Sequence, residues 1–247
     1  REYDEKLPSN LTAEEILIRS GNIGSVKIAQ RVGLENYRNF LKKLGILDEL
    51  KFDILEVGKP LQFNWGKCKL ATVSFGHGIT ITPLHLAKGY SVISNGGYDV
   101  NPTIIKKENN YKKNKKIILK KDVSQKINKI LRKIVNTKDG TAGLADVEGF
   151  EIGGKTGTAQ QVENGVYSRK KINTFASIFP ISNPKYVLIV LLEAPKTSKD
   201  YIYKYRNKPG TFIGTPFNTA GWTSVEITGR IIEKIGPILA IKYLDPV

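Results

Sequence analysis

The sequence predicts a fold of mixed helices and strands, and three observations lead to this expectation. Apolar residues recur three to four apart in several segments of the first 135 residues, which is the spacing of amphipathic helices. Three strand-like segments then follow closely, at residues 153–160, 174–181 and 186–193. The last of them is continuously apolar, so we expect it to be buried on both faces. A final amphipathic helix is predicted over residues 223–241.

Composition limits the class of protein. The chain has 247 residues, enough for one large domain or two small ones. Its net charge of +16 favours anionic partners such as nucleic acid, a membrane surface or an acidic glycopolymer, although a lysine-biased proteome gives the same surplus. One cysteine, Cys68, excludes an internal disulfide, and no apolar run is long enough to span a membrane. The chain starts at Arg1 and contains no Met, so we interpret it as a piece of a longer protein.

Local signals place the N-terminal helices. Thr12 is a predicted N-cap, and Glu15, three residues later, completes a capping box. Ser20-Gly21-Asn22 then reads as a turn, since small and polar residues interrupt the apolar pattern. Two further short helices are predicted at residues 25–32 and 34–44.

Two later helices also have start signals. Thr82 followed by Pro83 predicts an N-cap with proline in the first turn, in a helix that ends at Asn95-Gly96-Gly97. Asp122 is the predicted N-cap of a helix over residues 122–135. In the last helix, Pro237 is expected to kink or end it, and the residues expected to face inward are Val225, Ile227, Ile231, Ile232 and Ile235.

The basic segment at residues 106–121 raises the question of nucleic acid. Lysines there are interleaved with Tyr111 and asparagines, but the sequence holds no Arg-rich stripe, no glycine–aromatic RNA motif and no zinc finger. We therefore expect a solvated loop or hairpin and no nucleic-acid partner. His77 and His85 have no clustered carboxylates or cysteines near them in the sequence, so we expect no metal, and no cofactor is predicted.

The predicted strand at residues 153–160 carries the polar pattern most suggestive of chemistry. Gly154 and Gly157 have no Cβ, which lets a substrate backbone come close. Thr156 and Thr158 share one face of an extended strand, and Lys155 adds a positive charge beside them. We expect this face to receive a carboxylate, with two hydroxyls and an ammonium as its ligands.

These residues resemble the K-T-G-T motif of the penicillin-binding proteins and serine β-lactamases, which accompanies S-x-x-K and an S-D-N-type triplet in that superfamily. Alone the motif also fits an ordinary glycine-bearing strand. Ser20-Gly21-Asn22 is similar to S-x-N and precedes K-T-G as the family requires, although such a turn is common. The stretch at residues 74–97 is similar to the S-x-G-H-G-x-x-x-T-P-L-x-L-A segment of class B penicillin-binding proteins. The Ala220-Gly221-Trp222 segment resembles the septal, division-specific type.

The resemblance implies an α+β fold, in which an antiparallel sheet is flanked by helices, with residues 1–247 as the C-terminal part of a single transpeptidase domain. It implies a peptidoglycan D,D-transpeptidase at the division septum. The elongation-specific class B transpeptidase, a D,D-carboxypeptidase or β-lactamase, and a non-catalytic penicillin-binding module are alternatives that share the motifs. The implied partners are D-Ala-D-Ala stem peptides, β-lactams and, for the full-length protein, divisome membrane proteins. The implied location is the inner membrane, with one membrane span and a periplasmic catalytic domain.

The resemblance also implies residue roles. The Thr158 N–H contributes to the oxyanion hole, and Thr156 and Thr158, with Gly157 between them, hold the substrate carboxylate. Lys155 stabilises that charge and hydrogen-bonds Ser20, which relays a proton to the leaving amine. Asn22 holds the substrate amide. The S-x-x-K motif with the nucleophile is expected N-terminal to Ser20, together with the first strands of the sheet. The letters at residues 168–171 fit S-x-x-K but lie after K-T-G in an expected polar loop, so we reject them.

Overall fold

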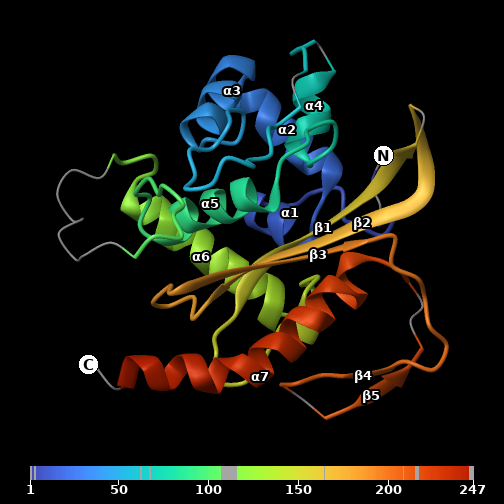
Figure 1. Cartoon of the computed structure of the whole chain (residues 1–247). Coiled ribbons are helices and arrows are strands. Elements are labelled where there is room, and N and C mark those ends of the chain that lie inside the picture. The colour runs from blue at the N-terminus through green and yellow to red at the C-terminus, as the bar shows by residue number, and fades with distance from the viewer. Residues whose placement is uncertain are drawn as a thin grey trace. The chain divides into compact units, whose positions relative to one another are not determined.

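The computed structural model describes residues 2, 4–61, 63–66, 68–106, 116–163, 165–207, 209–214 and 217–244 (Figure 1). The chain divides into two compact units, residues 1–128 and 129–247, and each is described by itself. The single domain expected for residues 1–247 stays a prediction.

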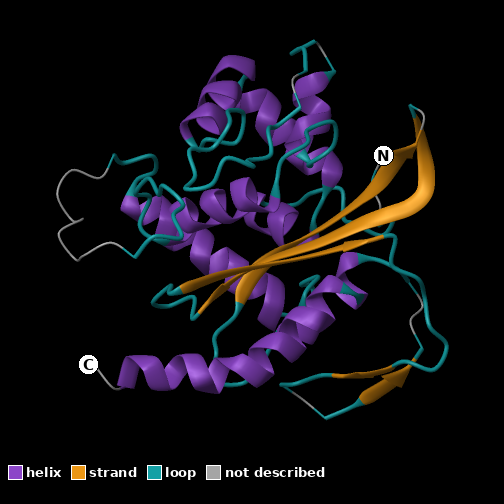
Figure 2. Cartoon of the chain, viewed as in Figure 1, coloured by secondary structure: helices purple, strands orange, loops and turns teal. Residues whose placement is uncertain are grey.

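The first unit is helical in its described part, as Figure 2 shows in purple. One apolar cluster of its core is formed by Leu44, Ile46 and Val92, against which partly buried side chains such as Phe40 and Ile81 pack. Its helices, with α6 continuing into the second unit, are α1 Ala13–Arg19, α2 Asn22–Val32, α3 Leu34–Lys43, α4 Lys69–Ser74, α5 Pro83–Ser94 and α6 Lys121–Asn136.

The first helix begins as the sequence predicts. The Thr12 hydroxyl accepts the Glu15 N–H at 3.2 Å, and the Glu15 carboxylate accepts the Thr12 N–H at 2.7 Å, so the capping box is complete. The hydrogen bond from the Thr12 backbone lowers the pKa of the Glu15 carboxyl. The predicted turn is shorter than expected, because α2 begins at Asn22 and not at residue 25. Its first N–H groups, those of Asn22 and Ile23, are accepted by the Glu2 carboxylate at 2.7 Å each, and this distant cap has no local sequence signal.

The start of α5 is also confirmed, with Thr82 as N-cap and Pro83 in the first turn. His85 is fully buried in this helix, and its ring bonds the Thr82 hydroxyl at 2.7 Å and the Asp48 carbonyl at 2.9 Å. The prediction for Asp122 is wrong in detail: α6 begins at Lys121, so Asp122 lies in its first turn and is not the N-cap. Most of the basic segment expected to be a loop or hairpin, residues 107–115, lies outside the described residues.

The second unit contains a three-stranded antiparallel sheet in the order β1-β2-β3, as expected (Figure 1). Its strands are β1 Gly153–Glu163, β2 Val166–Phe179 and β3 Tyr186–Glu193. The last helix, α7 Ser224–Leu244, packs on β2 and β3. Buried side chains of these elements form the core, among them Phe175, Ile178, Val225 and Ile232.

Two expectations about this sheet are wrong in part. The polar loop predicted at residues 163–171 is mostly strand: pairing continues to Glu163↔Val166, and the Lys170 ammonium bonds the Glu163 carboxylate at 2.8 Å. The third strand is not buried on both faces, since only Val190 is buried within it and Leu191 is 47% exposed. Among the described strands it is an edge, so one of its sides has no neighbouring strand to cover it.

The last helix departs from expectation at its end. It continues through Pro237 to Leu244, so the proline does not end it. Ile235 is 39% exposed although the pattern places it inward. The next residue, Gly236, packs so closely on Phe150 that a Cβ there would lie 2.4 Å from the ring. The buried stripe of α7 therefore stops near Gly236, and beyond it Ile238 and Ile241 are 68% and 60% exposed.

The segment at residues 195–222 is more ordered than the surface excursion expected from its composition. It contains a small hairpin of β4 Ile202–Lys204 and β5 Thr211–Ile213. Tyr203 is buried and meets the edge of Trp222 at 5.4 Å between ring centroids. The Arg206 guanidinium, 7% exposed, pairs with the buried Glu226 carboxylate of α7 at 3.2 Å. This buried ion pair fastens the excursion to the last helix.

Candidate active site

The Gly153–Ala159 motif occupies the first half of β1, which is an edge strand of the described sheet. Lys155, Thr156, Gly157 and Thr158 pair in register with Ala176, Phe175, Thr174 and Asn173 of β2. The prediction of a strand here is confirmed. An edge strand presents alternate N–H and C=O groups on its outer side, where an extended ligand can add as a further strand.

Two of the three glycines in the motif, Gly154 and Gly157, have different reasons to be glycine. A Cβ at Gly154 would lie 2.5 Å from the Ala176 carbonyl oxygen and 2.7 Å from the Phe175 ring. The prediction that Gly154 makes room for a substrate is therefore wrong, because its space is taken by the neighbouring strand. A Cβ at Gly157 would meet only Thr174 atoms, at 3.9 Å. Gly157 alone of the pair leaves open space for an approaching ligand.

The two threonine hydroxyls are each held by a distant segment. The Thr156 hydroxyl bonds the Thr141 hydroxyl at 2.8 Å, and the Thr158 hydroxyl oxygen accepts the Ala220 N–H at 3.0 Å. Because a hydroxyl that accepts from an N–H still has its own proton, the exposed Thr158 side chain can donate a hydrogen bond to an anion. Thr141 and Ala220 were not assigned to the site from the sequence, and neither gives a local signal for this contact.

Lys155 is placed differently from the expectation. Side chains alternate along a strand, so Lys155 lies on the face of β1 opposite to Thr156 and Thr158, and the three groups do not share one face. Its ammonium instead donates to the Thr156 carbonyl oxygen at 3.1 Å. Burial lowers the pKa of Lys155 to about 8, because desolvation disfavours the charged form. An anion bound nearby favours the charged form and would raise this pKa again.

The other two candidate residues belong to the first unit. Ser20 follows α1 as its C-cap, with a left-handed φ of 60° and an exposed side chain. Such a conformation is uncommon for residues other than glycine and often accompanies functional sites. Asn22 is the first residue of α2 and is half-buried. Lys155, Thr156, Gly157 and Thr158 belong to the second unit, so the approach of Ser20 and Asn22 to them stays a prediction.

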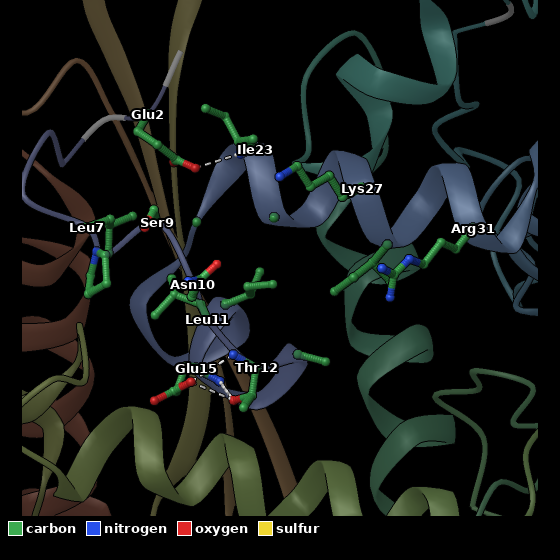
Figure 3. A pocket seen from close by; sticks show the side chains of 16 residues that line it. Glu2, Leu7, Ser9, Asn10, Leu11, Thr12, Glu15, Ile23, Lys27 and Arg31 are labelled. Atoms are coloured by element: carbon green, nitrogen blue, oxygen red, sulfur yellow. Dashed lines mark hydrogen bonds between the residues drawn. The ribbon is translucent and has the colours of Figure 1, made fainter.

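A hollow of about 690 Å3 adjoins the Ser20-Gly21-Asn22 turn within the first unit (Figure 3). Residues 7–13, which lead into and begin α1, form one side of it. Gly21 also lines it, and the α2 side chains Lys27 and Arg31 lie on the other side, as Figure 3 shows. The hollow is therefore partly apolar and carries two cations on one helix.

Other sequence patterns find no chemical role in the described part of the chain. Ser168 to Lys171 lie in β2 and not in the loop expected, and a strand is not the helix start that an S-x-x-K nucleophile needs. No group of three or more His, Cys, Asp or Glu side chains that could hold a metal occurs among the described residues. Over the same residues, no helix has the length and apolar content needed to cross a membrane.

The family of the chain follows from comparison with known proteins. Residues 1–210 match the family model described as the penicillin binding protein transpeptidase domain. The chain belongs to this family. The resemblance inferred from the K-T-G-T and S-x-N motifs is thereby confirmed, and so is the expected α+β fold with an antiparallel sheet and flanking helices.

Curated relatives are similar over most of the chain. The "Probable peptidoglycan D,D-transpeptidase FtsI" of Caulobacter vibrioides is 32% identical over 241 residues, which cover 94% of this chain and 39% of the relative. The peptidoglycan D,D-transpeptidase FtsI of Buchnera aphidicola is 32% identical, covering 81% of this chain and 36% of the relative. The chain thus spans well under half the length of these curated relatives.

Solved structures share the fold. Penicillin-binding protein 3 of Mycobacterium tuberculosis, complexed with aztreonam, matches with a TM-score of 0.73 and 25% identity, over 91% of this chain and 52% of that one. The transpeptidase domain of Burkholderia pseudomallei penicillin-binding protein 3 matches with a TM-score of 0.78 and 23% identity, over 92% of this chain and 65% of that one.

Proposed function

We propose that this chain forms part of a serine-type peptidoglycan D,D-transpeptidase that cross-links stem peptides at the division septum. The arrangement of polar groups along β1 carries the proposal. The Lys155 ammonium donates to the Thr156 carbonyl oxygen, and the Thr158 hydroxyl keeps a proton that it can donate to an anion. Membership of the transpeptidase-domain family supports the reaction class. The names of the Caulobacter and Buchnera relatives support both the peptidoglycan substrate and the septal role.

The backbone of β1 supports an oxyanion site at Thr158. The N–H and C=O of one residue in an antiparallel strand point to the same side, and that side alternates along the strand. The Thr158 N–H therefore points to the same side as the Thr156 carbonyl, which receives the Lys155 ammonium. We assign this side as the outer edge of β1, away from β2. The Thr158 N–H then donates to the oxyanion of the tetrahedral intermediate, a contact typically worth about 10²–10³ in rate.

Side chains of the same stretch bind the end of the donor peptide. The Thr158 and Thr156 hydroxyls receive its terminal carboxylate, and the open space at Gly157 admits its backbone. Lys155 provides a cation at the strand edge, where a hydrogen bond to a carboxylate is charge-assisted and strong. We further assign Ser20 as the proton relay to the leaving amine and Asn22 as a ligand of the substrate amide. Both tasks require side chains to come within hydrogen-bond reach, about 2.6–3.2 Å.

The proposed reaction is acyl transfer through a serine. A serine oxygen bonds to the carbonyl carbon of the penultimate D-Ala, and the bond to the terminal D-Ala breaks as that amine takes up a proton. An acceptor amine then displaces the serine and completes the cross-link. We assign the nucleophile to no residue from 1 to 247. β-Lactams are the proposed inhibitors, which is supported by the aztreonam and ampicillin complexes of the Mycobacterium tuberculosis protein.

We extend the proposal to location and partners of the full-length protein. A transpeptidase acting on stem peptides works in the periplasm, so we propose an inner-membrane anchor and a periplasmic catalytic domain. Divisome membrane proteins are the proposed partners, on the strength of the FtsI names of the relatives. Depletion in the native host should give filaments with incomplete septa, whereas round cells would favour the elongation-specific alternative.

Labelling of the full-length protein with fluorescent penicillin tests the proposed activity. We expect a covalent adduct that forms quickly and hydrolyses slowly, and that is lost in Lys155→Ala and Thr158→Val. Gln160→Ala is the matched control, since Gln160 is exposed on the same strand just beyond the motif. Rapid turnover of the drug would indicate a β-lactamase, and release of D-Ala without cross-links a carboxypeptidase. Reversible binding without an adduct would indicate a non-catalytic module.

A further inference from the structure

Asn173 is a fully buried polar side chain in β2, at the register position opposite Thr158. The sequence around it, Asn173 to Phe179, is otherwise dominated by apolar and small residues. A buried amide in such a strand is costly unless it is hydrogen-bonded. The identity of its partners therefore indicates what this residue does.

The amide nitrogen of Asn173 holds the turn that precedes α7. It donates to the Asn218 carbonyl oxygen at 3.0 Å and to the Thr223 hydroxyl oxygen at 2.8 Å. A carbonyl can only accept, and the Thr223 hydroxyl already gives its proton to the Thr219 carbonyl at 2.9 Å. Both partners therefore require a donor, which fixes the orientation of the amide.

The amide oxygen of Asn173 makes no hydrogen bond within the described residues. A buried acceptor without a partner destabilises the folded state, a penalty that an apolar residue of similar size avoids. Generic core packing therefore does not explain an asparagine here. What Asn173 supplies is the pair of donated bonds to residues 218–223.

The turn at residues 218–223 also holds Thr158. The N–H of Ala220 in this turn donates to the Thr158 hydroxyl oxygen at 3.0 Å. A second side chain of β2 holds the turn as well, since the Lys171 ammonium donates to the Asn218 side-chain oxygen at 2.8 Å. The contacts thus run from β2 to the turn and from the turn back to β1.

We propose that Asn173 is a positioning residue, which fixes the 218–223 turn so that the Thr158 hydroxyl donates its proton to the substrate carboxylate. The Ala220 N–H occupies the hydroxyl oxygen on the side of the turn, so the hydroxyl proton points elsewhere. Loss of the Asn173 bonds frees the turn, and Thr158 then loses its fixed rotamer. This inference rests on the proposed function, because it assigns the carboxylate of the donor peptide, or of a β-lactam, to Thr158.

The test compares a penicillin with its carboxylate methyl ester on the full-length protein. The ratio of the two second-order acylation rates measures recognition of the carboxylate, and general destabilisation lowers both rates together. We expect this ratio to fall about tenfold in Asn173→Ala, as loss of one hydrogen bond to a charged group predicts. Asn173→Asp keeps the shape but has no N–H to donate, so it should not restore the ratio.

Ser177→Ala is the matched control. Ser177 is fully buried on the same face of β2, and its hydroxyl donates to the Leu188 carbonyl at 3.0 Å, away from the turn. This variant should lower the melting temperature and leave the ratio unchanged. Lys171→Ala should lower the ratio of acid to ester acylation rates by less than Asn173→Ala does. If Asn173→Ala does not fold, Lys171→Ala tests whether the turn affects recognition of the carboxylate.

The outcomes separate the two proposals. If the wild type is acylated by neither compound, the proposed function fails. If it reacts much faster with the acid than with the ester, the proposed function stands. The ratios in the variants then test the positioning role of Asn173. A ratio in Asn173→Ala equal to that of Ser177→Ala would overturn the inference. If Asn173→Ala does not fold, an unchanged ratio of acid to ester acylation rates in Lys171→Ala would also overturn the inference. A wild type that reacts equally fast with the acid and the ester would overturn it as well.

Discussion

Replacing Gly154 and Gly157 by alanine, one at a time, should separate folding from catalysis. At Gly154 the new methyl would lie 2.5 Å from the Ala176 carbonyl oxygen, where ordinary contacts begin at 3.4 Å. That oxygen belongs to the central strand and the nearby Phe175 ring is fully buried, so neither can retreat cheaply. Overpacking of this kind costs about 1–3 kcal/mol. For a domain of this size each kcal/mol lowers the melting temperature by about 2–4 °C.

Gly157→Ala is the partner experiment. The new methyl meets nothing closer than Thr174 atoms at 3.9 Å, so the free energy of unfolding should stay within about 0.5 kcal/mol of the wild type. The same methyl occupies the space through which the substrate backbone approaches, and acylation by fluorescent penicillin should slow at least tenfold, roughly the effect of 1.4 kcal/mol. Thermal melts and labelling rates of the full-length variants give both values. A Gly154→Ala protein that melts like the wild type, or a Gly157→Ala protein that loses as much stability as Gly154→Ala, would refute this reasoning.

Three further predictions concern charge and the reactive residue. The pKa of Lys155 is about 8 in the folded chain and lies below its ordinary value of 10.5, so the folded chain loses this proton at a lower pH than the unfolded chain. The rate of acylation by a carboxylate-bearing penicillin should therefore fall as pH rises through about 8. The free energy of unfolding should rise between about pH 8 and pH 10.5, because the unfolded chain binds more protons there. Lys155→Arg should remove the fall in rate with pH, and a rate that stays flat to pH 10 in the wild type would contradict the role of the ammonium. Arg206→Ala leaves the Glu226 carboxylate buried beside Arg230 and Tyr201, and chemical denaturation should show a loss near the lower end of the about 3–5 kcal/mol typical of a broken buried pair. An Arg206→Met and Glu226→Leu double variant should recover part of that loss, and no recovery would indicate that Arg206 acts by packing alone. Residues 1–247 expressed alone, and shown by circular dichroism to be folded, should not be acylated; a drug-sized mass increase mapped to any of their serines would reveal a nucleophile that we have overlooked.

The elements that the sequence predicted well are those specified by neighbouring residues. Thr12 with Glu15 and Thr82 with Pro83 are complete start signals within four residues, so both helices begin where expected. The start of α2 was misplaced because its cap comes from Glu2, twenty residues away. The β1–β2 turn was misplaced because polar side chains on an exposed hairpin resemble a loop in composition, although the strands pair to their ends.

The site divides in the same way. The residues that we propose as substrate ligands on β1 could be found from a contiguous motif, whereas the residues that hold them could not. Thr141, Ala220 and Asn173 reach the motif through the fold, from positions 15 to 62 residues away. Only Asn173 gives a signal, as a polar residue directly before the largely apolar segment predicted as a strand at residues 174–181. The prediction that Lys155, Thr156 and Thr158 share one face of β1 was also wrong. Side chains alternate along a strand, and this alternation separates Lys155 from the two threonines.

The supports explain why the excursion at residues 195–222 is built as it is. A hydroxyl on an edge strand can rotate unless something holds it, and the Ala220 N–H that holds Thr158 belongs to the end of this excursion. The excursion is held in turn on α7 by the ion pair between Arg206 and Glu226. It is also held by the Asn207 side-chain amide, which donates to the Asp146 carboxylate at 2.7 Å. Because these bonds are buried or partly buried, they resist screening by salt better than surface pairs do. The geometry of one exposed hydroxyl on β1 thus depends on buried polar contacts made far from it along the chain, and substitutions at those contacts should alter carboxylate recognition before they abolish folding.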